Sequence, residues 1–131
     1  MNPRALLHQY LDQCPLIAII RGVTPGEAFC RGVRDGLGNA DLTAELFAVR
    51  ARVLLGQAEA RDAASYTSGL LIGTDVRIGL AQPLAAQVVV MGRPELTALY
   101  AASIRQAHRE ASELDGERCF LAGISKLAER I

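Results

Sequence analysis

The alternation of hydrophobic and polar residues along the chain predicts a mostly helical α/β protein with few strands. Apolar residues that recur at steps of three and four indicate helices, and short continuous apolar runs indicate strands buried on both faces. The pattern is αβα–αα–βα, with too few strands for a closed sheet. The predicted strands cover 16–20 and 87–91, and the predicted helices cover 4–13, 25–35, 42–54, 59–78, a segment from 94 and a segment from 116.

The clearest helix follows Asp41, a residue type that caps helix N-termini. Leu42, Leu46, Val49 and Val53 recur at steps of four, three and four, which places them on one face. This segment is therefore predicted to be an amphipathic helix that stops before the glycine at position 56.

The helix over 59–78 contains Gly69 and Gly73, four residues apart and on one side. Each glycine costs up to about 1 kcal/mol relative to alanine in a helix interior. We therefore expect another helix backbone to come close there. Its predicted inner face consists of Ala63, Ala64, Thr67, Leu70, Leu71, Thr74 and Ile78.

The last helix is expected to open at Asp115-Gly116. Its predicted inner face consists of Phe120, Leu121, Ile124, Leu127 and Ala128.

Two strand-to-helix corners are candidate binding sites. The strand 16–20 ends at Arg21 before a capped helix start, an arrangement that can bind an anion through the guanidinium and free N–H groups. The strand 87–91 ends at Met91, and Gly92 and Arg93 then lead into a helix, so a ligand can approach the backbone closely. On the residues alone, each corner is also compatible with a plain turn that binds nothing.

Composition narrows the class of protein. The chain of 131 residues is 50% hydrophobic and 21% charged, which is typical of one folded domain. Its 14 basic and 14 acidic residues give formal neutrality, which argues against a nucleic-acid binder and removes one barrier to self-association. Three scattered cysteines without CxxC spacing favour a reduced, cytoplasmic protein with neither zinc nor disulfides. The sequence contains no apolar run long enough for a membrane span.

The segments EAFCRGVRDGLGNADLTAELFAVRARVLLG, SGLLIGTDV, VVVMGRPELTALY and DGERCFLAGISKLA give a more specific indication. In this order and spacing, residues 27–131 resemble the C-terminal third of the 2-dehydro-3-deoxygalactonate kinases. The resemblance implies a mostly helical partial lobe of the actin-like sugar-kinase fold. It also implies ATP and Mg²⁺ as cofactors and a sugar acid as substrate, with Met91, Gly92 and Arg93 against the adenosine part of ATP.

The parts that perform phosphoryl transfer in that family are missing from the matched segment. Its first phosphate loop is an Asp-Trp-Gly-Thr-like hairpin, and this chain contains no tryptophan. The second phosphate loop and the catalytic acid precede the matched segment, so no catalytic residue and no metal ligand is assigned. Because phosphoryl transfer depends on positioned phosphates and neutralised charge, we expect the chain to be inactive by itself.

The N-terminal segment, MNPRALLHQYLDQCPLIAIIRGVTPGEA, resembles the start of the 2-dehydro-3-deoxy-6-phosphogalactonate aldolases. The resemblance implies one βα segment of TIM-barrel origin over 1–26, with Arg21 as a substrate-binding residue. Aldolases of this family need a Schiff-base lysine and a carboxylate on later strands, and Lys126, the only lysine here, matches neither position.

These observations lead to a prediction with two alternatives. The chain is predicted to be a truncated 2-dehydro-3-deoxygalactonate kinase of D-galactonate catabolism, with residues 1–26 and 27–131 as separate parts. The first alternative is a non-catalytic helical interaction fragment, whose uncovered apolar faces would drive association. An aldolase remnant ranks last because its lysine and carboxylate are missing.

Overall fold

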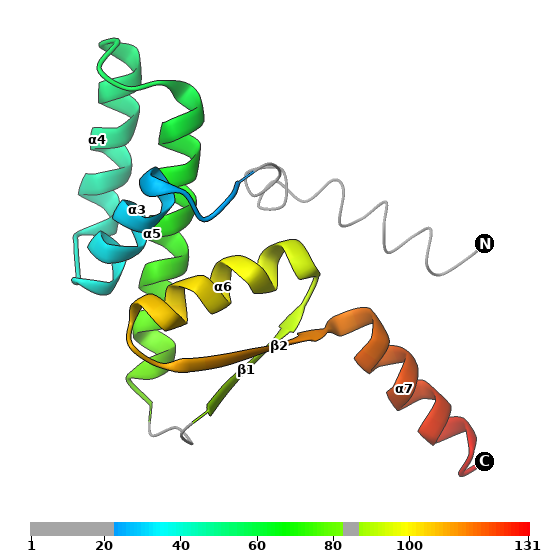
Figure 1. The fold of residues 1–131 in the computed structure, drawn as a ribbon. Coiled ribbons are helices and arrows are strands. Elements are labelled where there is room, and N and C mark those ends of the chain that lie inside the picture. The colour runs from blue at the N-terminus through cyan, green and yellow to red at the C-terminus, as the bar shows by residue number, and fades with distance from the viewer. Residues whose placement is uncertain (1–22, 83–86) are drawn as a thin grey trace.

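The computed structural model describes residues 23–82 and 87–131 of the chain. The predicted helix over 4–13, the predicted strand over 16–20 and Arg21 lie outside the described residues. Figure 1 shows an upright group of three helices beside a small strand–helix–strand unit, from which the last helix extends. The elements are α3 (Glu27–Leu37), α4 (Leu42–Leu54), α5 (Ala60–Leu80), β1 (Gln87–Gly92), α6 (Pro94–Gln106), β2 (Glu110–Asp115) and α7 (Gly116–Ala128).

Helices α3 and α5 pack with their backbones in contact, as the glycine spacing predicts. A Cβ atom added at Gly73 would lie 2.6 Å from the Val33 carbonyl oxygen, and one added at Gly36 would lie 2.5 Å from the Leu70 oxygen. Gly32 and Gly69 meet the opposite backbone still more closely. Two glycines four residues apart on each helix therefore form the tightest contact in the described fold.

This close packing decides which face of α5 is buried. The predicted inner face is only partly right: Leu70 is buried and Ala63 packs against its cluster, whereas Ile78 is exposed. The buried residues of α5 are Tyr66, Ser68, Gly69, Leu70, Ile72, Gly73 and Val76. The physical reason is that small residues permit backbone contact with α3, and this contact sets the helix orientation before the apolar side chains do.

Helix α4 begins as predicted, because the Asp41 carboxylate accepts a hydrogen bond of 3.1 Å from the Ala44 N–H. Val49 is buried in a small cluster with Tyr66 and Leu70, whereas Phe47 on the other side is exposed. One face of the amphipathic helix is therefore partly covered by α5.

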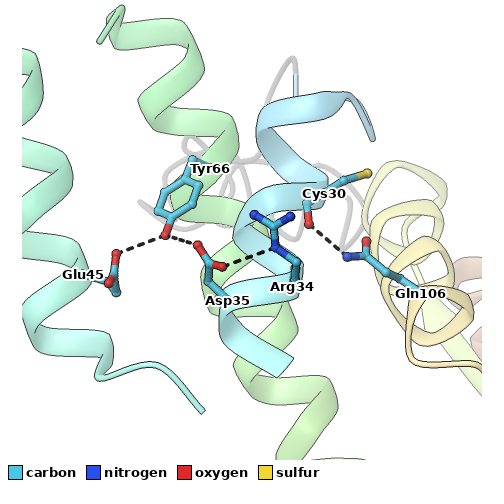
Figure 2. Close-up of polar contacts among 6 residues, drawn as sticks. All are labelled: Cys30, Arg34, Asp35, Glu45, Tyr66 and Gln106. Atoms are coloured by element: carbon cyan, nitrogen blue, oxygen red, sulfur yellow. Dashed lines mark hydrogen bonds and ion pairs between the residues drawn. The ribbon is translucent and has the colours of Figure 1, made fainter. Parts of the chain in front are cut away.

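Polar contacts join the three upright helices and α6 (Figure 2). The Tyr66 hydroxyl on α5 lies 2.7 Å from Asp35 Oδ2 on α3 and 3.1 Å from Glu45 Oε2 on α4. Burial, and then these two carboxylates, raise the pKa of Tyr66 above its ordinary value. Gln106 at the end of α6 donates a hydrogen bond of 3.0 Å to the Cys30 carbonyl oxygen on α3.

The structure confirms a strand over 87–91, which is β1. The prediction that this strand is buried on both faces is wrong, because Val89 and Met91 are 54% and 63% exposed. Strand β1 pairs in parallel with β2. The sequence did not predict β2, because its residues EASELD show neither an apolar run nor regular alternation. The register pairs Val89 with Ser112 and Met91 with Leu114. Helix α6 connects the two strands, so the unit is a βαβ crossover.

The main core lies where α3, α5 and α6 meet the βαβ unit. It contains Phe29, Val33, Ile72, Val76, Leu99 and Ile104. Val88, Val90 and Ala111 pack against this cluster from one face of the sheet. The α5–α6 and α3–α6 contacts therefore fix the βαβ unit against the upright helices.

Helix α7 begins at the predicted residue, because the Asp115 carboxylate accepts hydrogen bonds from the Glu117 and Arg118 N–H groups. The prediction of an inner face on α7 is wrong. None of its residues is buried in the described part of the chain, and Phe120, Ile124 and Leu127 are 65%, 49% and 61% exposed. The helix extends away from the body, so no described element covers this apolar stripe (Figure 1).

Candidate functional site

The candidate site is the corner at the carboxyl ends of the two parallel strands. Gly92 ends β1 and is paired with Asp115, which ends β2. Helix α6 begins at Pro94 and α7 begins at Gly116, so two helix N-termini open beside this edge of the sheet. In α/β proteins, ligands bind outside the carboxyl ends of parallel strands, where helix N–H groups are available.

The two glycines of the corner have different roles. A Cβ atom added at Gly116 would lie 3.1 Å from the Gly92 Cα, so the close approach of the strand ends favours glycine at 116. A Cβ atom added at Gly92 would meet only Thr97 Cγ2 at an ordinary 3.5 Å. Gly92 thus contributes an open backbone surface, whereas Gly116 permits the corner to form. The sequence signal for Gly116 was the Asp-Gly pair, which we interpreted only as a helix start.

Arg93 is the N-cap residue of α6, and its guanidinium is incompletely satisfied. Its Nε lies 3.9 Å from Glu95 Oε2, and the side chain is 39% exposed. Nη1 is buried and has no hydrogen-bond partner in the described part of the chain. A buried donor of this kind is costly when it stays unpaired, so it provides a specific position for an acceptor atom of a ligand.

Carboxylates occupy much of the remaining corner. Glu113 Oε1 accepts a hydrogen bond of 2.9 Å from the Thr97 hydroxyl. Asp115 Oδ1 accepts from the Glu117 N–H at 2.9 Å and the Arg118 N–H at 3.2 Å, so a carboxylate already occupies the anion-binding end of α7. The corner therefore offers one guanidinium among several acceptors. This set matches hydroxyl and amino groups better than a chain of phosphates.

Although Met91 precedes Gly92 in the chain, its surroundings differ from those of Gly92 and Arg93. It is 63% exposed and lines a hollow of about 390 Å³ beside β1, between the end of α5 and α6. In this hollow the Tyr100 hydroxyl lies 2.7 Å from Asp75 Oδ2. Burial, and then the hydrogen bond to Asp75, raise the pKa of Tyr100 above its ordinary value. The structure thus divides the three residues predicted to contact adenosine between an apolar hollow and a polar corner.

In the described residues, no group of three or more His, Cys, Asp or Glu side chains could hold a metal ion. A search of the same residues finds no helix that is both long and apolar enough to cross a membrane.

The fold defines an α/β protein with a candidate ligand site at the ends of two parallel strands. Comparison with known proteins identifies the family to which the chain belongs. Residues 16–127 match the sequence pattern of the 2-keto-3-deoxy-galactonokinase family. The chain therefore belongs to the 2-keto-3-deoxy-galactonokinase family.

Two relatives support this assignment. The chain is 30% identical to the 2-dehydro-3-deoxygalactonokinase of Escherichia coli strain K12 over an alignment of 131 positions, which covers 95% of this chain and 44% of that protein. It also resembles a crystal structure described as that of a 2-dehydro-3-deoxygalactonokinase protein from Sinorhizobium meliloti. That similarity has a TM-score of 0.73 and 26% identity, and it covers 96% of this chain and 44% of the other. The chain thus spans less than half the length of both relatives.

The comparisons give no support to an aldolase origin of the N-terminal segment. The family match already begins at residue 16, inside the segment assigned to an aldolase, and the two relatives cover nearly the whole chain. The TIM-barrel interpretation of this segment has no support either. The division of the chain at residue 26 stays a prediction.

Proposed function

We propose that this chain forms the adenosine-side part of a 2-dehydro-3-deoxygalactonate kinase of D-galactonate catabolism. Such a kinase would transfer a phosphoryl group from ATP to a sugar-acid hydroxyl in the cytoplasm. The observation that carries the proposal is the family match over residues 16–127, which contains the complete strand-end corner. We also propose that the chain forms a partial lobe of the actin-like sugar-kinase fold.

The proposed contacts follow from the chemistry of the corner. The open backbone at Gly92 lets a flat base approach, and the unpaired Arg93 Nη1 donates to an acceptor atom of the nucleoside. Glu113, which bonds Thr97, accepts from a ribose hydroxyl. Met91 supplies an apolar contact from the rim of the hollow. When bound to a complete kinase, ATP supplies the transferable phosphate. The role proposed for this chain is to bind and orient the nucleoside.

We further propose that the chain by itself does not catalyse phosphoryl transfer. That step requires phosphates held in line, a neutralising Mg²⁺ and a group that orients the attacking hydroxyl. The described residues contain no three-membered set of metal-ligand side chains, so we assign this chain no step that depends on its holding Mg²⁺. Arg21, proposed as a sugar-acid contact by the N-terminal resemblance, lies outside the described residues, and its role stays a prediction.

Thermal unfolding with a series of nucleotides tests the proposal. If only the nucleoside is bound, adenosine, ADP and ATP should stabilise the chain equally, by about 1.4 kcal/mol at ten times the dissociation constant. Gly92→Val should abolish the effect, because a branched side chain would fill the open surface. Gly123→Ala is the matched control, since no atom lies within 4 Å of an added Cβ there. Stabilisation by ATP but not by adenosine would contradict the proposed contacts.

An assay of ATP consumption with 2-dehydro-3-deoxygalactonate tests the second part. We expect no turnover above the rate without the sugar acid. Turnover that disappears in Gly92→Val would show that the chain has catalytic groups that we did not identify. That result would leave the family assignment unchanged, but it would contradict the proposal that this chain only binds and orients the nucleoside.

The alternative, a non-catalytic interaction fragment, is favoured by a different observation. Phe47 and Leu54 are each 75% exposed and lie seven residues apart on one side of α4, and Phe120 on α7 is 65% exposed. Contiguous exposed apolar side chains mark interaction surfaces. Binding to another polypeptide through Phe47 and Leu54 does not exclude nucleotide binding, because both lie on α4, which contributes no residue to the corner.

A further inference from the structure

Thr97 contacts two parts of the strand-end corner and is almost fully buried, at 3% exposed. It lies in the first turn of α6, three residues after the helix begins at Pro94. Its methyl carbon Cγ2 lies 3.5 Å from a Cβ added at Gly92, and its hydroxyl oxygen Oγ1 lies 2.9 Å from Glu113 Oε1. One side chain therefore connects the backbone surface proposed for the base with the carboxylate proposed for the sugar.

The hydroxyl of Thr97 has one proton and two neighbouring acceptors. The Pro94 carbonyl oxygen lies 3.3 Å from Oγ1, beyond the usual hydrogen-bond range, whereas Glu113 Oε1 lies at 2.9 Å. A hydrogen bond to a carboxylate is also stronger than one to a neutral carbonyl. Thr97 therefore donates to Glu113. Because threonine is β-branched, the χ1 angle that directs the hydroxyl to Glu113 also fixes the methyl group toward Gly92.

The register of the sheet brings Glu113 to Thr97. Glu113 is paired with Val90, which packs against the main core beneath α6, and paired residues of neighbouring strands lie on the same face. The bond from Thr97 occupies Oε1, while Oε2 has no partner within residues 23–82 and 87–131, and the residue is exposed. A carboxylate oxygen only accepts hydrogen bonds, so a ligand atom that meets Oε2 must donate one.

We infer that Glu113 selects nucleosides with free ribose hydroxyls, and that Thr97 is the positioning residue that orients its carboxylate for this contact. The inference rests on the nucleoside site proposed above and specifies the sugar that this site prefers. A ribose hydroxyl donates to Glu113 Oε2 while the base lies over Gly92 and the methyl group of Thr97. A deoxy sugar lacks one of the two donors, and a phosphate ester at either position would bring negative charge against the carboxylate.

The expected selectivity follows from the charge of the acceptor. A hydrogen bond to a charged group contributes enough for at least a tenfold difference in affinity between ligands that have and lack the donor. A long side chain that the ligand itself must immobilise reduces the affinity by a factor of about three to ten. Because the bond from Thr97 fixes Glu113 before the ligand binds, loss of that bond should reduce the selectivity by this smaller factor.

Calorimetric titration of the full chain with adenosine, 2′-deoxyadenosine and 3′-deoxyadenosine tests the inference. The wild type should bind adenosine at least tenfold more tightly than one of the deoxynucleosides, and the weaker ligand identifies the hydroxyl concerned. Glu113→Ala should bind all three equally. This variant should keep its fold, because Glu113 is exposed and the Thr97 hydroxyl still has the Pro94 oxygen as an acceptor. Glu110→Ala is the matched control and should keep the wild-type selectivity, because Glu110 is also exposed but lies at the other end of β2, paired with Gln87.

Two substitutions at Thr97 distinguish positioning from a structural role. Thr97→Val keeps a methyl group beside Gly92 but removes the hydroxyl, so the ratio of the deoxynucleoside and adenosine dissociation constants should fall about three- to tenfold. Thr97→Ser keeps the hydroxyl and should keep the wild-type ratio. A structural role alone would weaken the binding of all three nucleosides together and leave the ratio unchanged.

The outcomes that overturn the inference differ from those that overturn the proposed function. Equal binding of the three nucleosides by the wild type would contradict the inference and leave the nucleoside site at Gly92 unaffected. An unchanged ratio in Glu113→Ala or in Thr97→Val would also contradict it. If the wild type binds none of the three nucleosides, the proposed function is wrong and the inference fails with it.

Discussion

The glycine contact between α3 and α5 gives the strongest prediction for stability. In Gly73→Ala the new Cβ would lie 2.6 Å from the Val33 oxygen and 2.9 Å from its Cα. Ordinary carbon–oxygen contacts are about 3.3 Å or longer. Since both obstructing atoms belong to the backbone, no side-chain rotation relieves the clash, and α3 must move outward by about 0.7 Å.

The magnitude follows from two opposing effects. Alanine gains about 1 kcal/mol over glycine in a helix interior. Overpacking costs about 3 kcal/mol at the upper end of its usual range, which suits a contact between two backbones. A gap of 0.5–1 Å also forfeits roughly a quarter to a half of each dispersion contact, and Phe29, Val33 and Leu70 lie buried at this interface. We expect a net loss of about 2 kcal/mol, which corresponds to a decrease in Tm of about 8 °C.

Thermal and urea unfolding of Gly73→Ala and Gly79→Ala provide the assay. Gly79 lies on the same helix, but no atom lies within 4 Å of an added Cβ. Gly79→Ala should therefore stabilise the chain by about 0.5–1 kcal/mol. If Gly73→Ala stabilised the chain as much as Gly79→Ala, the close contact between α3 and α5 would not exist in solution, and the reasoning would be refuted.

Two further predictions concern α7 and the two hydrogen-bonded tyrosines, Tyr66 and Tyr100. Asp115→Ala should cost about 1 kcal/mol of α7 stability, because two N–H groups lose their acceptor; faster amide exchange confined to α7 would confirm it, and unchanged exchange would contradict it. The raised pKa values of Tyr66 and Tyr100 mean that the folded state keeps two protons that the unfolded state releases near pH 10. The free energy of unfolding should therefore fall as pH rises above about 10, and the Tyr66→Phe/Tyr100→Phe double variant should flatten this slope in urea titrations. An equal slope in both proteins would be inconsistent with the hydrogen bonds to Asp35, Glu45 and Asp75.

Local sequence features fixed the positions of several elements. Asp41 and Asp115 mark the starts of α4 and α7, since each carboxylate accepts from N–H groups of the first turn. The three consecutive valines predicted β1. Gly69 and Gly73 predicted a close helix backbone, which is α3. These features act within a few residues along the chain, so no knowledge of the tertiary structure was necessary.

The candidate site was predictable only in part. The turn at Gly92 and Arg93 follows from a strand, a glycine and a proline in sequence. Its partner residues, Asp115 and Gly116, join the corner because β2 pairs in parallel with β1. That pairing is a property of two segments brought together by α6, and the polar sequence of β2 does not encode it locally.

By itself, the sequence determined several helix starts, the position of strand β1 and membership of a kinase family. Caps, glycine spacing and family motifs are local signals, and each can be read without a partner segment. Only the tertiary structure decided which faces are buried, because burial requires another element at the right place. The residues of α5 predicted to face inward gave way to the glycine contact with α3. The apolar stripe of α7 lies exposed because α7 leaves β2 without a connecting loop, so no described element packs against it.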